Sequence, residues 1–135
     1  MTLVVPNQGE VIALKALLNH TAPQNLDLRL YTSNTTPSET DTEVTYTEAV
    51  GHGYAAIQLT AADWVVTEGD PSVAEYPDQT FTFTGALGGV YGYYITQRIS
   101  GKLVWAERFS NGPYSIANNG DTVKITPAIT LSTKQ

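Results

Sequence analysis

Cysteine is absent from the 135 residues of the chain, and only two histidines, His20 and His52, occur. Without cysteine the chain forms no disulfide, offers no thiolate to a metal ion and has no cysteine nucleophile. Metal centres and acid–base sites need several converging side chains, so two isolated histidines predict neither. Capping is the simpler interpretation of His20, which follows a helical pattern. We therefore expect no metal and no cofactor.

Positive charge and long apolar runs are scarce as well. Seven Lys and Arg stand against thirteen Asp and Glu, and the formal net charge is -6. A chain of this charge repels polyanions, which predicts no nucleic-acid partner. No apolar run approaches the ~18–20 residues that span a bilayer, and the N-terminus lacks the basic region of a secretory signal. We expect a soluble protein that is made in the cytoplasm and has no membrane partner.

Sequence signatures of catalysis are missing too. No serine lies in a Gly-x-Ser-x-Gly elbow, and no glycine-rich run leads to a lysine as in a phosphate-binding loop. The glycines of residues 85–89 follow an expected strand without opening a helix, so a turn is their simpler interpretation. Together these absences predict that the protein is not an enzyme.

The residues that are abundant favour β-structure. The hydrophobic fraction is 41% and the charged fraction 15%, and threonine, tyrosine and valine are frequent, as in half-buried strands. The length suits one domain over residues 1–135. The exception is residues 7–19, where apolar residues recur at helical spacing behind Asn7, a candidate N-cap. We expect one amphipathic helix there, ended before Pro23.

After this helix the apolar period changes to two, which is typical of strands. Leu26, Leu28 and Leu30 alternate with polar residues, and Phe81 and Phe83 alternate with threonines. Residues 90–97 and 102–109 predict a hairpin, and residues 122–131 supply the last strand or strands. The pattern predicts a mainly β fold, a β-sandwich of short antiparallel strands with one N-terminal amphipathic α-helix. The core residues we predict are Val11, Leu14, Leu18, Phe81, Phe83, Trp105, Ile125 and Leu131.

Aromatic residues concentrate at Tyr91, Tyr93, Tyr94 and Trp105. Alternation sends Tyr94 to the face opposite Tyr91 and Tyr93, so one set is expected to enter the core and the other to cover a surface. Exposed aromatic rings could stack on sugars, lie in a subunit interface or close the core.

Two segments are candidate partner contacts. The N-terminal arm, residues 1–6, places apolar residues in a row at a chain end, so it needs burial against a neighbour or against its own sheet. The polar loop, residues 33–48, has few anchors, and a partner surface would offset the entropy lost in ordering it. Its acids Glu39, Asp41 and Glu43 match no calcium-loop spacing, and solvated charge is favoured. The interface residues we predict are Leu3, Val4, Val5, Pro6, Pro37 and Tyr46.

Several stretches resemble small structural proteins of tailed-bacteriophage virions, of the capsid decoration (cement) or tail-associated type. They are Val4-Val5-Pro6-Asn7, Leu28-Arg29-Leu30-Tyr31 followed by the polar loop, residues 103–109 and residues 120–127. The resemblance implies a non-enzymatic β-domain without a cofactor, located in the virion. It implies binding to other virion proteins, either the major capsid protein or tail and connector proteins, as a homo-oligomer for which a threefold ring is our first expectation.

Two alternatives remain open beside a structural role in the capsid: a tail-associated or host-attachment module that binds glycans, and an enzyme. The resemblance does not distinguish head, connector and tail positions.

Overall fold

The computed structural model describes residues 3–132. These residues form a mainly β fold with several antiparallel sheets and one N-terminal helix, which confirms the predicted sandwich-like class. The elements are α1 (Asn7–Leu17), β1 (Leu26–Tyr31), the 3-10 turn η1 (Glu43–Thr45), β2 (Ile57–Leu59), the 3-10 turn η2 (Ala61–Asp63), β3 (Val65–Thr67), β4 (Ser72–Glu75), β5 (Gln79–Thr82), β6 (Gly88–Val90), β7 (Gly92–Gln97), β8 (Leu103–Arg108), β9 (Tyr114–Ile116), β10 (Thr122–Ile125) and β11 (Ala128–Leu131).

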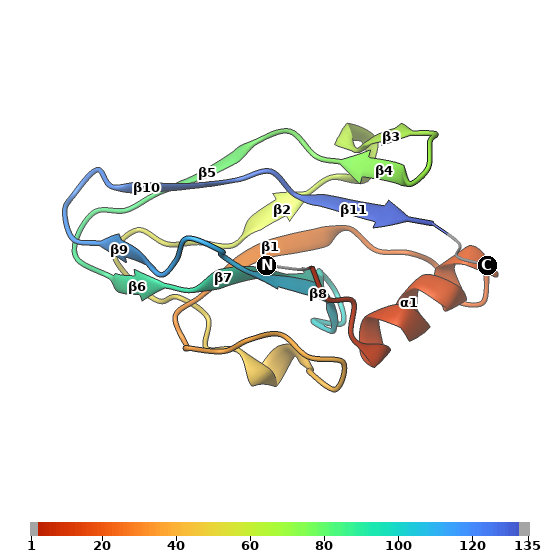
Figure 1. Cartoon of the computed structure of the whole chain (residues 1–135), viewed down its shortest axis with the longest axis horizontal. Coiled ribbons are helices and arrows are strands. Elements are labelled where there is room, and N and C mark those ends of the chain that lie inside the picture. Colours follow the sequence, from red (N-terminus) through yellow and green to blue (C-terminus); the bar gives the residue numbers. More distant parts are fainter. Residues whose placement is uncertain (1–2, 133–135) are drawn as a thin grey trace.

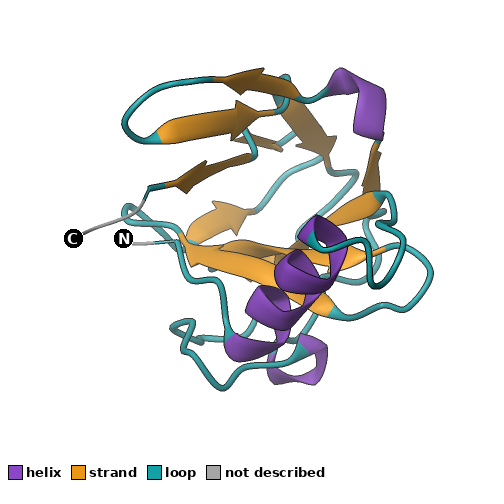
Figure 2. Ribbon diagram, turned by 90° about the vertical axis from the view of Figure 1, so that its right-hand side faces the viewer, coloured by secondary structure: helices purple, strands orange, loops and turns teal. Residues whose placement is uncertain are grey.

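The strands are arranged in two layers. A four-stranded antiparallel sheet of order β2-β1-β7-β8 forms the central layer. The two-stranded sheet β10-β5 and the three-stranded sheet β11-β4-β3 lie over one of its faces. Figure 1 shows this second layer above the central sheet and residues 33–48 below it. Seen from the side in Figure 2, the helices and loops flank the stacked strands. Among residues 3–132, no helix is long and apolar enough to cross a membrane.

The main core lies between the two layers. Alternation along β1 directs Leu28 and Leu30 into it, and Phe81 and Phe83 reach it from the opposite layer. Trp105 and Ile125 are 3% and 5% exposed, so four of the eight predicted core residues are confirmed. Phe81 also stacks on the ring of Tyr54, at 5.7 Å between centroids.

The other face of the central sheet is covered by the polar loop. All six residues of β7 are buried, which requires cover on both faces of the strand. A second apolar cluster lies beneath the loop and consists of Tyr31, Tyr46, Tyr94, Leu103 and Ala106. The loop therefore serves as a third layer, and Tyr46 is one of the few anchors that hold it on its own sheet.

Helix α1 docks on the edge strand β8 by a very close approach at Gly9. A Cβ atom at Gly9 would stand 1.9 Å from the carbonyl oxygen of Val104. The neighbouring Gln8 accepts a hydrogen bond from the Leu103 N–H through its Oε1, at 3.0 Å. The helix thus satisfies a backbone donor that an edge strand leaves free.

The ends of α1 differ from the predicted range 7–19. The N-cap is Pro6 rather than Asn7, because the carbonyl of Pro6 accepts the first helical hydrogen bond, from the N–H of Glu10 at 2.9 Å. The N–H of Asn7 donates to the carbonyl oxygen of Glu39 in the polar loop, also at 2.9 Å. At the other end Leu18 has left helical geometry and Asn19 has a φ of 57°. This left-handed residue ends the helix two residues before the predicted boundary.

Four of the predicted core residues are wrong. Val11, Leu14 and Leu18 are 48%, 57% and 73% exposed, and Leu131 is 80% exposed. Gly9 sets which face of α1 meets β8, and these three helical residues lie on the opposite face. Leu131 is two residues after Ile129 and points to the same face of β11 as Ile129, which packs against the core. Leu131 is the last residue of the strand, however, and lies beyond the end of the core.

Replacing Gly9 with alanine should destabilise the protein, although alanine is the better helix former by about 1 kcal/mol. The added methyl group would overlap the Val104 carbonyl, so α1 must move away from β8. We expect a loss of about 1–3 kcal/mol in denaturant melts, as for other overpacked sites. The control is Leu14→Ala on the exposed face, with a change below about 0.5 kcal/mol. A Gly9→Ala variant as stable as the wild type would contradict this docking.

Candidate functional site

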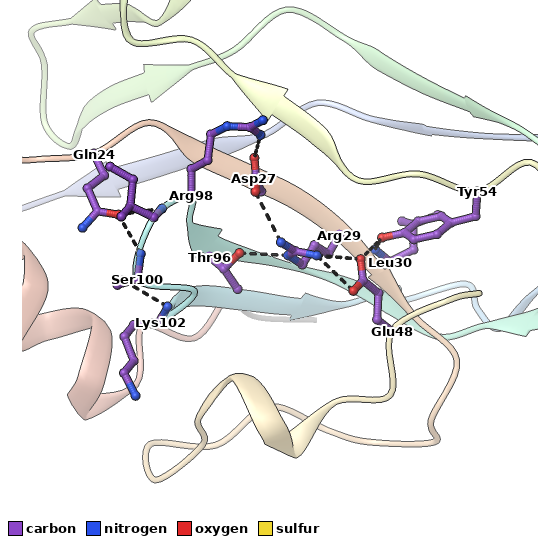
Figure 3. Close-up of polar contacts among 11 residues, drawn as sticks. Gln24, Asp27, Arg29, Leu30, Glu48, Tyr54, Thr96, Arg98, Ser100 and Lys102 are labelled. Atoms are coloured by element: carbon purple, nitrogen blue, oxygen red, sulfur yellow. Dashed lines mark hydrogen bonds and ion pairs between the residues drawn. The ribbon is translucent and has the colours of Figure 1, made fainter. Parts of the chain in front are cut away.

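Charged residues gather on the loop-covered face of the central sheet. Alternation places Asp27 and Arg29 of β1 on the face opposite Leu28 and Leu30. The register sets Asp27 beside Thr96 of β7. Figure 3 shows this cluster, with Glu48 entering from the chain that follows η1.

The guanidinium of Arg29 is the centre of the cluster. Its Nη1 donates to both carboxylate oxygens of Glu48, at 3.0 and 2.9 Å, and its Nη2 donates to Asp27 at 3.3 Å. Its Nε donates to the hydroxyl of Thr96 at 2.9 Å. The second oxygen of Asp27 accepts from Arg98 at 2.9 Å. Two carboxylates thus meet two guanidinium groups, and the formal charges cancel.

Tyr54 completes the cluster at the end of the β1–β2 pairing. Its hydroxyl donates to Glu48 Oε2 at 2.6 Å and accepts from the N–H of Leu30 at 3.2 Å. Burial, together with the hydrogen bond to Glu48, raises the pKa of the Tyr54 phenol above its usual range. The phenol therefore remains a donor to the carboxylate and satisfies a backbone group that β2 does not reach.

The electrostatics favour the ionised cluster. Burial by itself disfavours the charge on Arg29, but the hydrogen bond and the charge of Glu48 outweigh it and hold the pKa of Arg29 above its ordinary value. Both oxygens of Asp27 and both of Glu48 accept hydrogen bonds from within the chain. The arrangement fastens the segment after η1 to β1 and β7, and it holds its carboxylates in structural bonds.

The polar loop brings Pro37, Asp41 and Tyr46 inward. Pro37 is buried, and Tyr46 is 6% exposed, with its ring 5.1 Å from that of Tyr94. The hydroxyl of Tyr46 donates to Asp41 at 2.7 Å, and Asp41 also accepts from the backbone and the hydroxyl of Ser38. The expected solvated charge is therefore wrong for Asp41. Contact of Pro37 and Tyr46 with a partner stays a prediction, although their own chain already buries them.

The N-terminal arm lies along the outer edge of β8. Val4 and Ala106 exchange backbone hydrogen bonds of 2.9 and 3.0 Å, and Leu3 and Val5 pack against the main core. Pro6 is fully buried. Of the two kinds of burial expected for the arm, its own sheet supplies one, and a role of residues 3–6 in binding a partner stays a prediction. Residues 1–2 lie outside the described part of the chain.

The remaining candidate residues are dispersed. His20 is exposed beside Thr21, and His52 lies in a turn between two glycines. Glu43 pairs with Lys102 at 3.2 Å, and Glu39 is exposed. Within residues 3–132, no group of three or more His, Asp or Glu side chains is placed to hold a metal ion.

The aromatic concentration is largely internal. Tyr93, Tyr94 and Trp105 are at most 4% exposed, whereas Tyr91 is half-buried with the guanidinium of Arg108 5.3 Å from its ring centroid. The exposed aromatic residue is instead Tyr114, stacked on Phe109 at 4.6 Å. Tyr114 carries no sequence signal, because the strand β9 in which it lies has only three residues and shows no periodicity.

A hollow lies beside α1. It has a volume of about 540 Å³ and opens between the helix, residues 21–24 and the β7–β8 turn. Val11, Ile12 and Ala16 line its helical side. Sequence reasoning missed this groove because it assigned the outer residues of α1 to the core.

No known protein family, curated protein sequence or solved structure matches this chain.

Removing the charge of Arg29 should destabilise the protein clearly. An Arg29→Met variant leaves Glu48 without its cation and Asp27 with Arg98 alone, and we expect a loss of about 2–3 kcal/mol in denaturant melts. The value is below that of a fully buried pair because the Arg29 and Glu48 side chains keep 25% and 30% exposure. Lys124→Met is the matched control, since Lys124 and Asp78 are 65% and 52% exposed and should contribute less than about 1 kcal/mol. Equal losses in both variants would contradict a structural role of Arg29.

Stability should fall steeply in alkali. Burial raises the pKa of Tyr31 and of Tyr94 to about 12. Between the unfolded pKa of ~10 and pH 12 the unfolded chain loses protons that the folded chain keeps, so each phenol lowers stability by about 1.4 kcal/mol per pH unit. Below pH ~10 the contribution of both groups is complete.

Denaturant melts between pH 9 and 12 compare the wild type with a Tyr94→Phe variant. Above pH ~10 the free energy of unfolding of the variant should fall less steeply with pH than that of the wild type, by about 1.4 kcal/mol per pH unit, which is the contribution of one tyrosine. The substitution removes a hydroxyl that makes no hydrogen bond to the described residues. An unchanged slope would mean that Tyr94 ionises freely in the folded protein.

Proposed function

We propose that the protein is a non-enzymatic structural component of a tailed-phage virion, which decorates or reinforces the capsid through protein–protein contacts. Its partners are the major capsid protein or tail and connector proteins. The phage context rests on the sequence resemblance given above. The mode of action, through surfaces rather than through a catalytic site, rests on the distribution of side chains in the structure.

That distribution is the observation that carries the proposal. The carboxylates Asp27, Asp41 and Glu48 are held by bonds within the chain. Large apolar side chains, in contrast, are exposed on two separate surfaces. One is the outer face of α1, and the other is the edge strand β3, whose Val65 and Val66 point to opposite faces and are 62% and 74% exposed. Contiguous exposed apolar surface is typical of protein–protein interaction sites.

A tail-associated or host-attachment role with glycan binding is the second candidate. Tyr114, which is 38% exposed and stacked on Phe109, lines a hollow of about 200 Å³ with Glu107 and Lys124. An exposed ring beside polar groups can stack on a sugar and bind its hydroxyls. This candidate rests on one exposed ring, whereas the assembly role rests on two apolar surfaces.

Quantitative mass spectrometry of purified virions from the phage that encodes the chain tests the proposal. We expect the protein in every particle at a fixed copy number, and the number of copies distinguishes a head position from a connector or tail position. Absence from washed particles would overturn the virion role. A glycan array with the wild type and a Tyr114→Ala variant tests the second candidate, which predicts binding that the variant loses.

A further inference from the structure

The outer face of α1 is an apolar surface without a partner in the described chain. Successive residues of α1 are turned by about 100°, and the C-cap Leu18 keeps the helical hydrogen bond from its N–H to the Leu14 carbonyl. Val11, Leu14 and Leu18 therefore lie within one stripe, opposite the docked Gly9. We call Val11, Leu14 and Leu18 the apolar stripe. Their exposure of 48%, 57% and 73% shows that no residue of 3–132 covers them. Figure 2 shows α1 at the near end of the molecule, in front of the strands.

The spacing of the stripe fits another helix. Val11, Leu14 and Leu18 are three and then four residues apart, which are the a, d and a positions of a heptad. In coiled coils, side chains at these positions interlock with those at the same positions of a neighbouring helix. Leu17 widens the surface on one side and is 80% exposed. An apolar seam of this kind is self-complementary, so a second copy of this chain supplies a matching surface.

The charges beside the stripe indicate the orientation of the second helix. Glu10 lies along one flank and Lys15 along the other, in the g and e positions. When two parallel helices are related by a rotation axis along their length, the Glu10 flank of one faces the Lys15 flank of the other. When the helices are antiparallel, the Glu10 flank of one faces the Glu10 flank of the other, and the two Lys15 flanks face each other. Opposite charges therefore meet in the parallel arrangement alone.

The distance along the helix is compatible with this pairing. Five residues separate Glu10 from Lys15, about 7.5 Å of rise. Helical side chains lean toward the N-terminus, so the long side chain of Lys15 extends toward the level of Glu10 on the neighbour. Lys15 makes no ion pair with a described residue of its own chain.

We propose that the apolar stripe of α1 binds the α1 of a second copy in parallel, around a rotation axis beside the two helices. This inference rests on the proposed assembly role and names the homotypic contact within it. Gly9 fixes the opposite face of α1 on its own β8, so the two domains lie on the outer sides of the helix pair. With only two helices in contact the interface is small, and self-association is concentration-dependent.

Sedimentation velocity of the full chain, from micromolar to millimolar concentration, tests the contact. We expect the average mass to rise from that of the monomer with concentration. A Leu14→Ser/Leu18→Ser variant should weaken self-association by about tenfold or more, because it removes the centre of the seam. Val66→Ser is the matched control: Val66 is also exposed, at 74%, but lies on β3, and its variant should associate like the wild type.

Both variants should melt like the wild type, since the substituted side chains are exposed in the monomer. A wild type that stays monomeric at every concentration overturns the inference, and so does a serine variant of the stripe that associates as well as the wild type.

Orientation is tested by charge and by cross-linking. Glu10→Lys and Lys15→Glu should each weaken association several-fold, whereas the double swap should restore it. Because the chain has no cysteine, a single Val11→Cys substitution reports which residues face each other. Parallel helices bring Val11 beside Val11, so mild oxidation should yield a covalent dimer, and Val66→Cys should yield none. If Val11→Cys forms a disulfide only when mixed with Leu18→Cys, the helices are antiparallel and the proposed orientation is wrong.

The two proposals fail separately. A chain that self-associates but is absent from virions keeps this inference and loses the virion role. A chain that is present in virions and monomeric in solution at all concentrations keeps the virion role and loses this contact.

Discussion

The central four-stranded sheet has two faces that must both be kept from water, and most other features of the structure depend on that constraint. One face is covered by a second layer of strands. The other has no second sheet, and the polar loop covers it with tyrosine rings and a buried proline. Because β1 also carries charged residues on this face, cover is possible only where the charges cancel. The Arg29 cluster does this and ties the chain after η1 to the sheet.

The position of α1 follows from the same sheet. Its edge strand β8 needs cover, and the N-terminal arm and the helix supply it, the arm by pairing with Ala106 and the helix through Gln8 and Gly9. The close approach at Gly9 fixes the rotation of α1 about its axis. The apolar stripe is turned outward as a consequence. The docking of α1 on β8 therefore covers the edge of the sheet and also leaves an apolar surface exposed.

Charged and apolar side chains therefore occupy unusual places in this protein. Asp27 and Asp41 are inside and satisfied, whereas leucines and valines of α1 and β3 are exposed. A component of an assembly needs rigid domains with apolar contact surfaces, and this distribution supports the proposed role.

The sequence by itself determined the β-rich class, most of the strands and four of the eight core residues predicted from periodicity, because a period of two or of 3.6 is a local property. Phe81 and Phe83 could be assigned from their neighbours alone. The tertiary structure decided which face of a periodic element is buried. The helical period of Val11, Leu14 and Leu18 identifies one face of α1 but does not say whether that face is buried. The contact of Gly9 with Val104, 95 residues away in the chain, decided that it is exposed. The partners of Arg29 and the anchoring of Tyr46 were equally beyond the sequence, because they join segments whose proximity exists only once the sheet has formed.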